Sequence, residues 1–227
     1  MQDIYNSQTA APSASLETAK VLRNTYALLS MTLLFSAVTA GITMSLGLGR
    51  GAGFVMMLGA MALIWFVLPR TANSGAGIVT VFAFTGLLGG SLGPILNHYL
   101  AMANGGALIM QALGGTALVF FSLSAYVLTT RKDFSFMGGF LFIGLIVAIV
   151  ATIGMIVAAM LGYEVSIFSA AISAVMVLLM SGFILYDTSN IINGGETNYL
   201  HATTQLYLDI YLLFSHLLSL LGFLSDD

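Results

Sequence analysis

Cysteine is absent from this chain of 227 residues, and charged side chains make up only 7% of it. Without cysteine the chain can form no disulfide, has no thiolate nucleophile and offers no sulfur ligand to a metal. A soluble domain carries about 25% charged residues, so this chain has too few to cover a surface in contact with water. Hydrophobic residues account for 59% of the sequence. The composition therefore predicts an integral membrane protein.

Basic residues are also too few and too scattered to bind nucleic acid. The chain has six lysines and arginines, and they form no basic stripe with interleaved aromatic residues. The three histidines, His98, His201 and His216, lie far apart and show no metal-ligand spacing. These absences exclude a nucleic-acid partner and predict no firm metal site.

Seven apolar stretches, separated by short polar or glycine-rich breaks, are each long enough to cross a bilayer as a helix. They lie near residues 25–47, 51–69, 76–99, 107–130, 136–162, 165–189 and 202–224. Residues 1–19 are small and polar, and we expect them to form a flexible cytoplasmic tail. The sequence thus predicts an all-α membrane protein in which residues 20–227 form one domain of seven transmembrane helices.

The basic residues also predict the orientation. With seven spans, five of the six lie on the same side of the membrane as the N-terminus, and only Arg50 lies on the other side. Basic residues are enriched in cytoplasmic loops. We therefore expect a cytoplasmic N-terminus and a C-terminus on the opposite, periplasmic side. The five residues are Lys20, Arg23, Arg70, Arg131 and Lys132.

Small residues in the third span predict close helix packing. Gly86, Gly90 and Pro94 recur at intervals of four residues, and Gly89 and Gly93 share that spacing. Such residues let neighbouring helix backbones approach each other in lipid. The same stretch formally matches the G-x-S-x-G pattern of a hydrolase nucleophile, but that pattern needs a strand–turn–helix context. Here it falls inside a membrane span, so we interpret it as packing.

Two aspartates stand inside the last two spans, where a charge is costly and is a functional hypothesis by default. Asp187 lies about five residues before Ile192, near which the sixth span ends, or roughly 7 Å. Asp209 lies about six residues after the seventh begins, or roughly 9 Å. We expect the two carboxyl groups to lie at similar depth on neighbouring helices, near the cytoplasmic third of the membrane.

Helical spacing adds a polar stripe to this pair. Gln205, Asp209 and His216 fall on one face of the last span, and Asn190 follows Asp187 on the sixth. Two carboxyl groups in contact cannot both ionise cheaply, so they would share a proton and titrate as a unit. Such a pair can sense pH or ligate a hard cation such as Ca²⁺. Alternatively, each aspartate only hydrogen-bonds a neighbouring helix, and His216 is expected to be a buried hydrogen-bonding partner.

Enzymatic readings of the pair fail on the surrounding residues. An intramembrane aspartyl protease also uses two aspartates on helices, but the Gly-x-Gly-Asp context is missing around Asp187 and Asp209. A retinal protein needs a lysine in its seventh span for the Schiff base, and that span has none. We therefore predict that the protein is not an enzyme and uses no cofactor.

Four motifs resemble the Bax-inhibitor-type membrane family, and its bacterial YccA branch most of all. They are GLLGGSLGPI at 86–95, YVLTTRKD at 126–133, YDTSNII at 186–192 and GGETNY at 194–199. The resemblance runs from about residue 21 to residue 223. It implies a bacterial inner-membrane location and six helices wrapped around a central seventh, which would place Asp209 at the middle of the bundle.

The resemblance implies two competing functions. The YccA branch is known for modulating the membrane-bound AAA protease FtsH, which grips a cytoplasmic N-terminal tail, and the tail here has the corresponding position. Other members are pH-sensitive calcium leak channels that use an aspartate pair, and Asp187 and Asp209 match those positions. Those channels also pair an aspartate with an arginine in the second helix, whereas no basic residue lies between Arg50 and Arg70 here. Binding and restraining FtsH is therefore the leading hypothesis, and a pH-sensitive Ca²⁺ or cation leak is the alternative.

Overall fold

The computed structural model describes the backbone of residues 2–225 and the side chains of residues 16–225. That part of the chain is helical and contains no β-strand. Its elements are α1 (Gln2–Ser45), α2 (Arg50–Ala62), the π-helical η1 (Leu63–Val67), α3 (Leu68–Thr71), α4 (Ala76–Leu100), α5 (Gly105–Thr130), the 3-10 helix η2 (Ser135–Met137), α6 (Gly138–Met160), α7 (Ser166–Ile192) and α8 (Tyr199–Ser225).

Seven of these helical stretches are long and apolar enough to cross a membrane, which confirms the predicted seven-helix, all-α class. The second stretch, Arg50–Thr71, joins α2, η1 and α3, and the fifth, Ser135–Met160, joins η2 and α6. The other five are single α-helices. The chain is therefore a multi-pass membrane protein.

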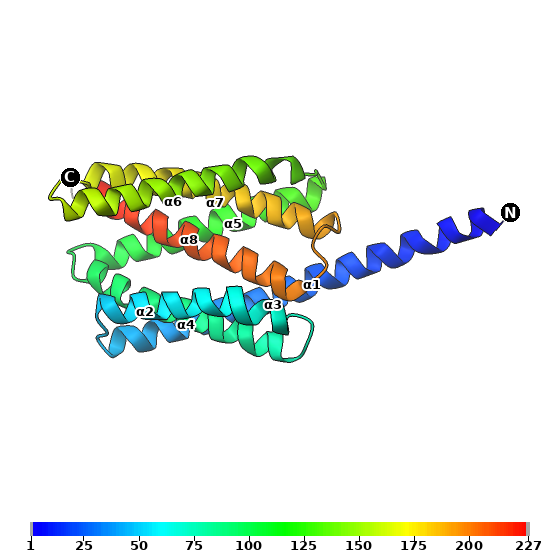
Figure 1. Ribbon diagram of the computed structural model, residues 1–227, viewed down its shortest axis with the longest axis horizontal. Coiled ribbons are helices and arrows are strands. Elements are labelled where there is room, and N and C mark those ends of the chain that lie inside the picture. The colour runs from blue at the N-terminus through cyan, green and yellow to red at the C-terminus, as the bar shows by residue number, and fades with distance from the viewer. Residues whose placement is uncertain (1, 226–227) are drawn as a thin grey trace.

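The first helix begins much earlier than the first predicted span. We expected it near residue 25, but α1 begins at Gln2 and runs for 44 residues. Its N-terminal turns project from the bundle as a long extension (Figure 1). Residues 1–19 include several alanines, a leucine and a glutamate, which favour helix, and they contain no glycine that would end a helix before the apolar run. The flexibility of this segment stays a prediction.

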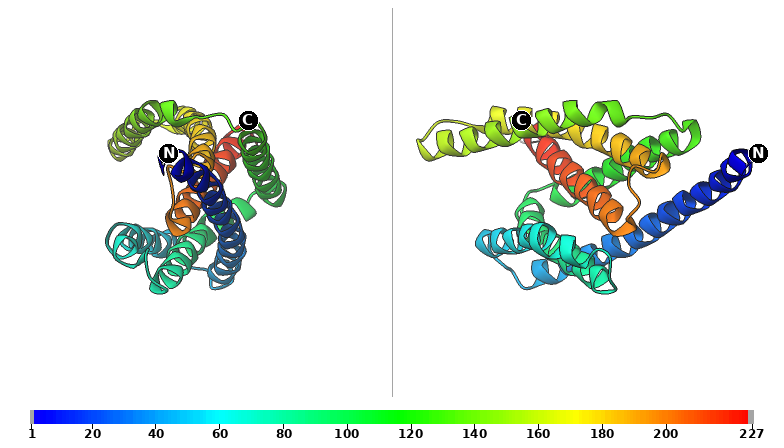
Figure 2. Two further views of the ribbon diagram at one scale, coloured as in Figure 1. Left: turned by 90° about the vertical axis from the view of Figure 1, so that its right-hand side faces the viewer. Right: turned by 45° about the vertical axis from the view of Figure 1, so that its right-hand side comes forward.

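The helices form two outer layers with α8 between them. Helix α8 contacts α1, α4, α5 and α7, whereas α2 packs on α4 and α6 packs on α7. Figure 1 shows α8 crossing diagonally between the α2–α4 layer and the α6–α7 layer, and Figure 2 shows the same crossing from two other sides. The last helix is therefore central, as the resemblance implied. Two of the six surrounding helices reach it only through a neighbour.

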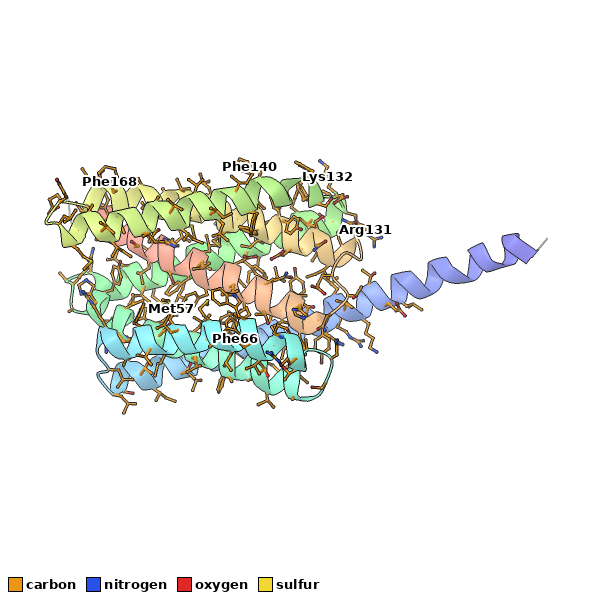
Figure 3. The ribbon with its side chains drawn as sticks, in the orientation of Figure 1. Met57, Phe66, Arg131, Lys132, Phe140 and Phe168 are labelled. Carbon is orange, nitrogen blue, oxygen red and sulfur yellow. The ribbon has the colours of Figure 1, made fainter. Side chains whose placement is uncertain are left out.

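The core lies around α8, and many other apolar side chains lie on the outer surface of the bundle. Leu206, Leu213 and Leu218 of α8 are fully buried. Phe140 and Phe168, labelled in Figure 3, are by contrast exposed, as residues in contact with lipid tails would be. Arg131 and Lys132 lie at the end of the bundle from which α1 projects (Figure 3).

Close packing of α4 depends on its glycines. A Cβ atom added at Gly89 would collide with Ser36 of α1, and one added at Gly93 would collide with Thr43. The Thr43 hydroxyl also donates a hydrogen bond of 2.8 Å to the Gly90 carbonyl. Gly86 lies against Phe35 of α1, and Gly90 lies against Met56 of α2. Pro94 lies against Gly53 of α2. Side chains larger than hydrogen at these glycines would push α4 away from its two neighbours.

Candidate functional site

Asp187 is held near the C-terminal end of α7, five residues before the helix ends at Ile192. A tight turn follows, in which Gly194 adopts a φ of 77°, a conformation that favours glycine. The backbone N–H groups of Gly195 and Glu196 donate to the Asn190 carbonyl at 2.9 and 3.2 Å. This turn closes α7 and sends the chain back toward α8, which places the next helix beside Asp187.

Asp209 lies deeper along its helix than the sequence indicated. Helix α8 begins at Tyr199 rather than near residue 202, and Asn198 precedes it with its side-chain oxygen accepting from the Leu200 N–H at 2.9 Å. Asp209 is therefore ten residues, or roughly 15 Å, from the start of α8, compared with roughly 7 Å for Asp187 from the end of α7. The two still meet, because α8 crosses the bundle at a tilt (Figure 1).

The two aspartates form a buried pair. Each is 6% exposed, and their carboxyl groups lie within hydrogen-bonding reach of each other. A hydrogen bond between two carboxyl groups requires that one of them carry a proton. No other group of the described residues donates to Asp209 Oδ2, which is fully buried. The geometry therefore fits a pair that holds one shared proton.

The electrostatic surroundings of the pair contain no basic partner. Neither aspartate forms an ion pair with any lysine, arginine or histidine in the described part of the chain. Besides Asp209, the charged residue that acts on Asp187 is the acidic Glu196. A buried carboxylate without a cationic partner is costly. The missing arginine noted in the sequence is thus not replaced by a basic residue from another helix.

The pair alone is a poor site for calcium. Ca²⁺ takes about six to eight oxygen ligands. Two carboxyl groups supply at most four, and within residues 16–225 no group of three or more His, Asp or Glu side chains could hold a metal ion. The arrangement is therefore better suited to binding and releasing a proton than to holding a cation.

The other residues predicted for the site fall in three different places. Gln205 is exposed and makes no side-chain hydrogen bond with a described residue, so the structure leaves it outside the buried pair. Asn190 is half-buried, and its carbonyl closes the turn after α7. His216 is half-buried, and its Nδ1 lies 3.3 Å from Ser173 Oγ of α7. His216 is therefore a hydrogen-bonding partner, seven residues beyond Asp209.

A second polar cluster on α8 was missed by the sequence reasoning. The Tyr207 hydroxyl lies 2.6 Å from Ser36 Oγ of α1 and donates to the Thr85 carbonyl of α4 at 3.1 Å. One turn later, the Tyr211 hydroxyl lies 2.9 Å from Ser91 Oγ of α4. The available signal was a pair of tyrosines four residues apart inside a span. Their partners lie more than 100 residues away, so periodicity could not identify them.

Two cavities lie beside these groups, and neither is lined by an aspartate of the pair. One, of about 440 Å³, is mostly apolar and lies between α1, α4, α5 and α8, with Tyr207 and Tyr211 in its wall. The other, of about 350 Å³, lies toward the C-terminal end of α8 and has His216 in its wall. The aspartate pair is therefore separate from both.

Comparison with known proteins gives consistent matches along the chain. Residues 18–226 match the family model described as "Inhibitor of apoptosis-promoting Bax1". The protein named "Modulator of FtsH protease YccA" from Escherichia coli (strain K12) is 54% identical over 212 residues, which cover 93% of this chain and 94% of that protein. An uncharacterized membrane protein of Vibrio cholerae is 50% identical over 97% of this chain and 96% of its own length. An uncharacterized protein of Pseudomonas aeruginosa is 45% identical over the full length of both chains.

Proposed function

Because the chain belongs to the Bax-inhibitor family, we propose that it is a non-enzymatic inner-membrane protein that binds the membrane-bound AAA protease FtsH and restrains it. The observation that carries this proposal is the 54% identity, over 93% of the chain, to a relative named as a modulator of FtsH protease. Identity at this level over nearly the whole length makes a shared partner the simplest inference.

The shape of the molecule supports the proposal. Helix α1 projects well beyond the bundle, from the end that carries Arg131 and Lys132 (Figure 3). Under the positive-inside rule this end is cytoplasmic, where the ATPase of such a protease works. The projecting part of α1 is thus an accessible segment for the protease to engage, as a tail of the predicted kind would be.

The bundle behind this segment would resist extraction. Helix α8 is packed against four other helices, and its tyrosine hydroxyls are hydrogen-bonded to α1 and α4. A protease that has engaged α1 must break these contacts before it can pull further. We propose that this resistance occupies the protease and slows the degradation of other membrane substrates.

The direct test is binding and restraint by the intact protein. The full chain is expected to co-purify with the FtsH-type protease in detergent and to slow its degradation of an unrelated membrane substrate in vesicles. A variant that lacks residues 2–15 keeps all the described bundle contacts and serves as the matched comparison. It is expected to lose most of the restraint. Failure of the intact protein both to bind and to slow degradation would contradict the proposal.

A second candidate function is a proton-responsive cation leak, favoured by the buried Asp187–Asp209 pair. In vesicles loaded with a Ca²⁺ indicator, flux through the protein should change with pH. Replacing both aspartates by asparagine keeps their size and removes the titration, so the double variant is expected to lose the pH response. Glu164→Gln, in the loop between α6 and α7, is the control. Flux that is absent, or that keeps its pH response in the double variant, would exclude this role for the pair.

A further inference from the structure

The cavity of about 350 Å³ lies at the end of the bundle opposite the α1 extension, where α2 begins and α4 ends. It is a wedge between the two outer layers. Neither α2 nor α4 contacts α6 or α7, and α8 lies at the bottom of the wedge. Figure 1 shows α2 and α4 on one side of α8, and α6 and α7 on the other. Its volume falls in the range of roughly 300–1,000 Å³ that small-molecule sites occupy.

The wall of this cavity is rich in hydrogen-bond donors. It contains Arg50 of α2, His98 of α4 and His216 of α8, together with serine hydroxyls of α7 and α8 that include Ser169 and Ser219. Arg50 is the one basic residue that the sequence analysis assigns to this side of the membrane. No carboxylate of the described residues lines the cavity.

Several of these donors have no partner within the described part of the chain. The Arg50 guanidinium is exposed and forms no ion pair or hydrogen bond there, and the His98 ring has only an edge contact with the Tyr99 ring at 5.7 Å. Ser173 donates its single hydrogen to Ser219 at 3.2 Å, which leaves the Ser219 hydrogen free. The wall therefore offers one positive charge and several hydrogen-bond donors, with no carboxylate of the described residues to compete for them, which suits an anion.

We propose that this cavity binds a phosphate group. A guanidinium presents paired N–H donors that match the oxygens of a phosphate, and the bond is strengthened by charge. His98 and the hydroxyls of Ser169 and Ser219 would bind the remaining oxygens. The rest of the wall includes Ile95 and Ile172, which suits an apolar group attached to the phosphate. Basic pockets between membrane helices bind lipid head groups in this manner.

The phosphate can come from two sources with the same chemistry, a phospholipid head group or free phosphate in the aqueous phase. The first arm of the test uses the full chain in phosphatidylcholine nanodiscs that contain phosphatidylglycerol, with bound lipid counted by native mass spectrometry. The second arm titrates inorganic phosphate into the delipidated protein in dodecyl maltoside, a detergent without a phosphate group. Retention of phosphatidylglycerol identifies the head group, and binding in the second arm identifies free phosphate.

Four variants make either arm specific to the cavity. Arg50→Gln and His98→Gln are each expected to weaken binding by about tenfold, the loss of one charge-assisted hydrogen bond. Arg70→Gln, an exposed arginine at the opposite end of the chain's second span, is the matched control and should leave binding unchanged. Arg50→Lys should retain part of the affinity, because the charge remains while the paired donors are lost.

A readout on the unaltered protein covers the case in which a variant fails to fold. The chain has three histidines, so their ring resonances can be resolved by NMR. Addition of the phosphate-bearing probe should shift the signals of His98 and His216, and should leave that of His201, in the first turn of α8 at the other end, in place. The proposal is overturned if neither probe binds the unaltered protein, or if binding is equal in Arg50→Gln, His98→Gln and Arg70→Gln.

Discussion

Tyr207 joins three helices of the described core, and both of its hydrogen-bonding partners lie more than 100 residues away in the sequence. It is 1% exposed and connects α8 to Ser36 of α1 and to the Thr85 carbonyl of α4. Its ring also packs edge-on against Phe84, with centroids 5.7 Å apart. The replacement Tyr207→Phe keeps the ring and removes both hydrogen bonds. We expect it to lower the free energy of unfolding in detergent by about 1 kcal/mol, a usual value for a hydrogen bond between membrane helices.

The control for this measurement is Tyr163→Phe. Tyr163 lies in the loop between α6 and α7 and is exposed, and its hydroxyl makes no hydrogen bond with a described residue. Its replacement should leave the free energy of unfolding unchanged. Equal stability of Tyr207→Phe and Tyr163→Phe would show that the buried hydroxyl adds nothing to the folded state.

Single residues differ in how far the sequence could predict them. Asp187 and Asp209 could be found because a charge inside an apolar span is rare, and the structure brings the two together. Gln205 could not be placed correctly, because a spacing of four residues predicts a shared helix face but not which turn of that face a neighbour covers. The partners of Tyr207 depend on how three helices pack, and no local pattern encodes that.

At the scale of helices, the contact between α1 and α4 depends on glycines, whose lack of a side chain lets the two backbones come close. Gly89 approaches Ser36 so closely that an added methyl group would meet both the hydroxyl and the carbonyl of that residue. We expect Gly89→Ala to destabilise the bundle by about 1–3 kcal/mol, since overpacking forces the backbones apart. Thermal or detergent-induced unfolding, followed by helical circular dichroism, measures the change.

Gly114→Ala is the matched control for this helix contact. Gly114 lies inside α5 and is exposed, and a Cβ atom there would meet nothing within 4 Å. In an open helical position alanine is favoured over glycine by up to about 1 kcal/mol, so this replacement should be neutral or stabilising. If both replacements have the same effect, close approach at Gly89 is not what holds α1 and α4 together.

Several helix ends were predictable from glycine and asparagine in the breaks, although Pro69 did not end the second stretch, which continues to Thr71. The breaks at Gly47–Gly49, Asn104 and Gly162 correspond to ends of helices in the structure, and Gly47 and Gly162 adopt the positive φ that glycine permits. The start of α1 was not predictable from hydrophobicity, because residues 2–19 are polar while their backbone continues the helix. Apolar length predicts the part of a helix that lies in the bilayer, not its extension into water.

At the scale of the whole molecule, the two-layer arrangement could not be derived from short loops alone. A short connection accompanies the contact between α6 and α7, but the equally short one between α1 and α2 does not make those two helices neighbours. Loop length also says nothing of α1 and α4, which pack extensively. The central place of α8 was implied by the family resemblance and by no feature of its own sequence. The position of Asp209 within the bundle therefore depended on that resemblance.

Orientation in the membrane is a property of the whole chain, and it can be tested cleanly because the chain has no cysteine. A single introduced cysteine is the only thiol available to a membrane-impermeant reagent. Glu164→Cys lies in the loop between α6 and α7, and Ser74→Cys lies in the loop before α4. With seven spans these two loops face opposite sides of the membrane.

The positive-inside rule assigns Ser74 to the cytoplasmic side, since Arg70, Arg131 and Lys132 lie on that side with the N-terminus. The reagent should therefore label Glu164→Cys in spheroplasts whose inner membrane is intact, and Ser74→Cys only after that membrane is permeabilised. The reverse pattern would put the α1 extension outside the cell's cytoplasm, out of reach of a cytoplasmic ATPase. It would thereby contradict both the orientation and the proposed engagement of the protease through α1.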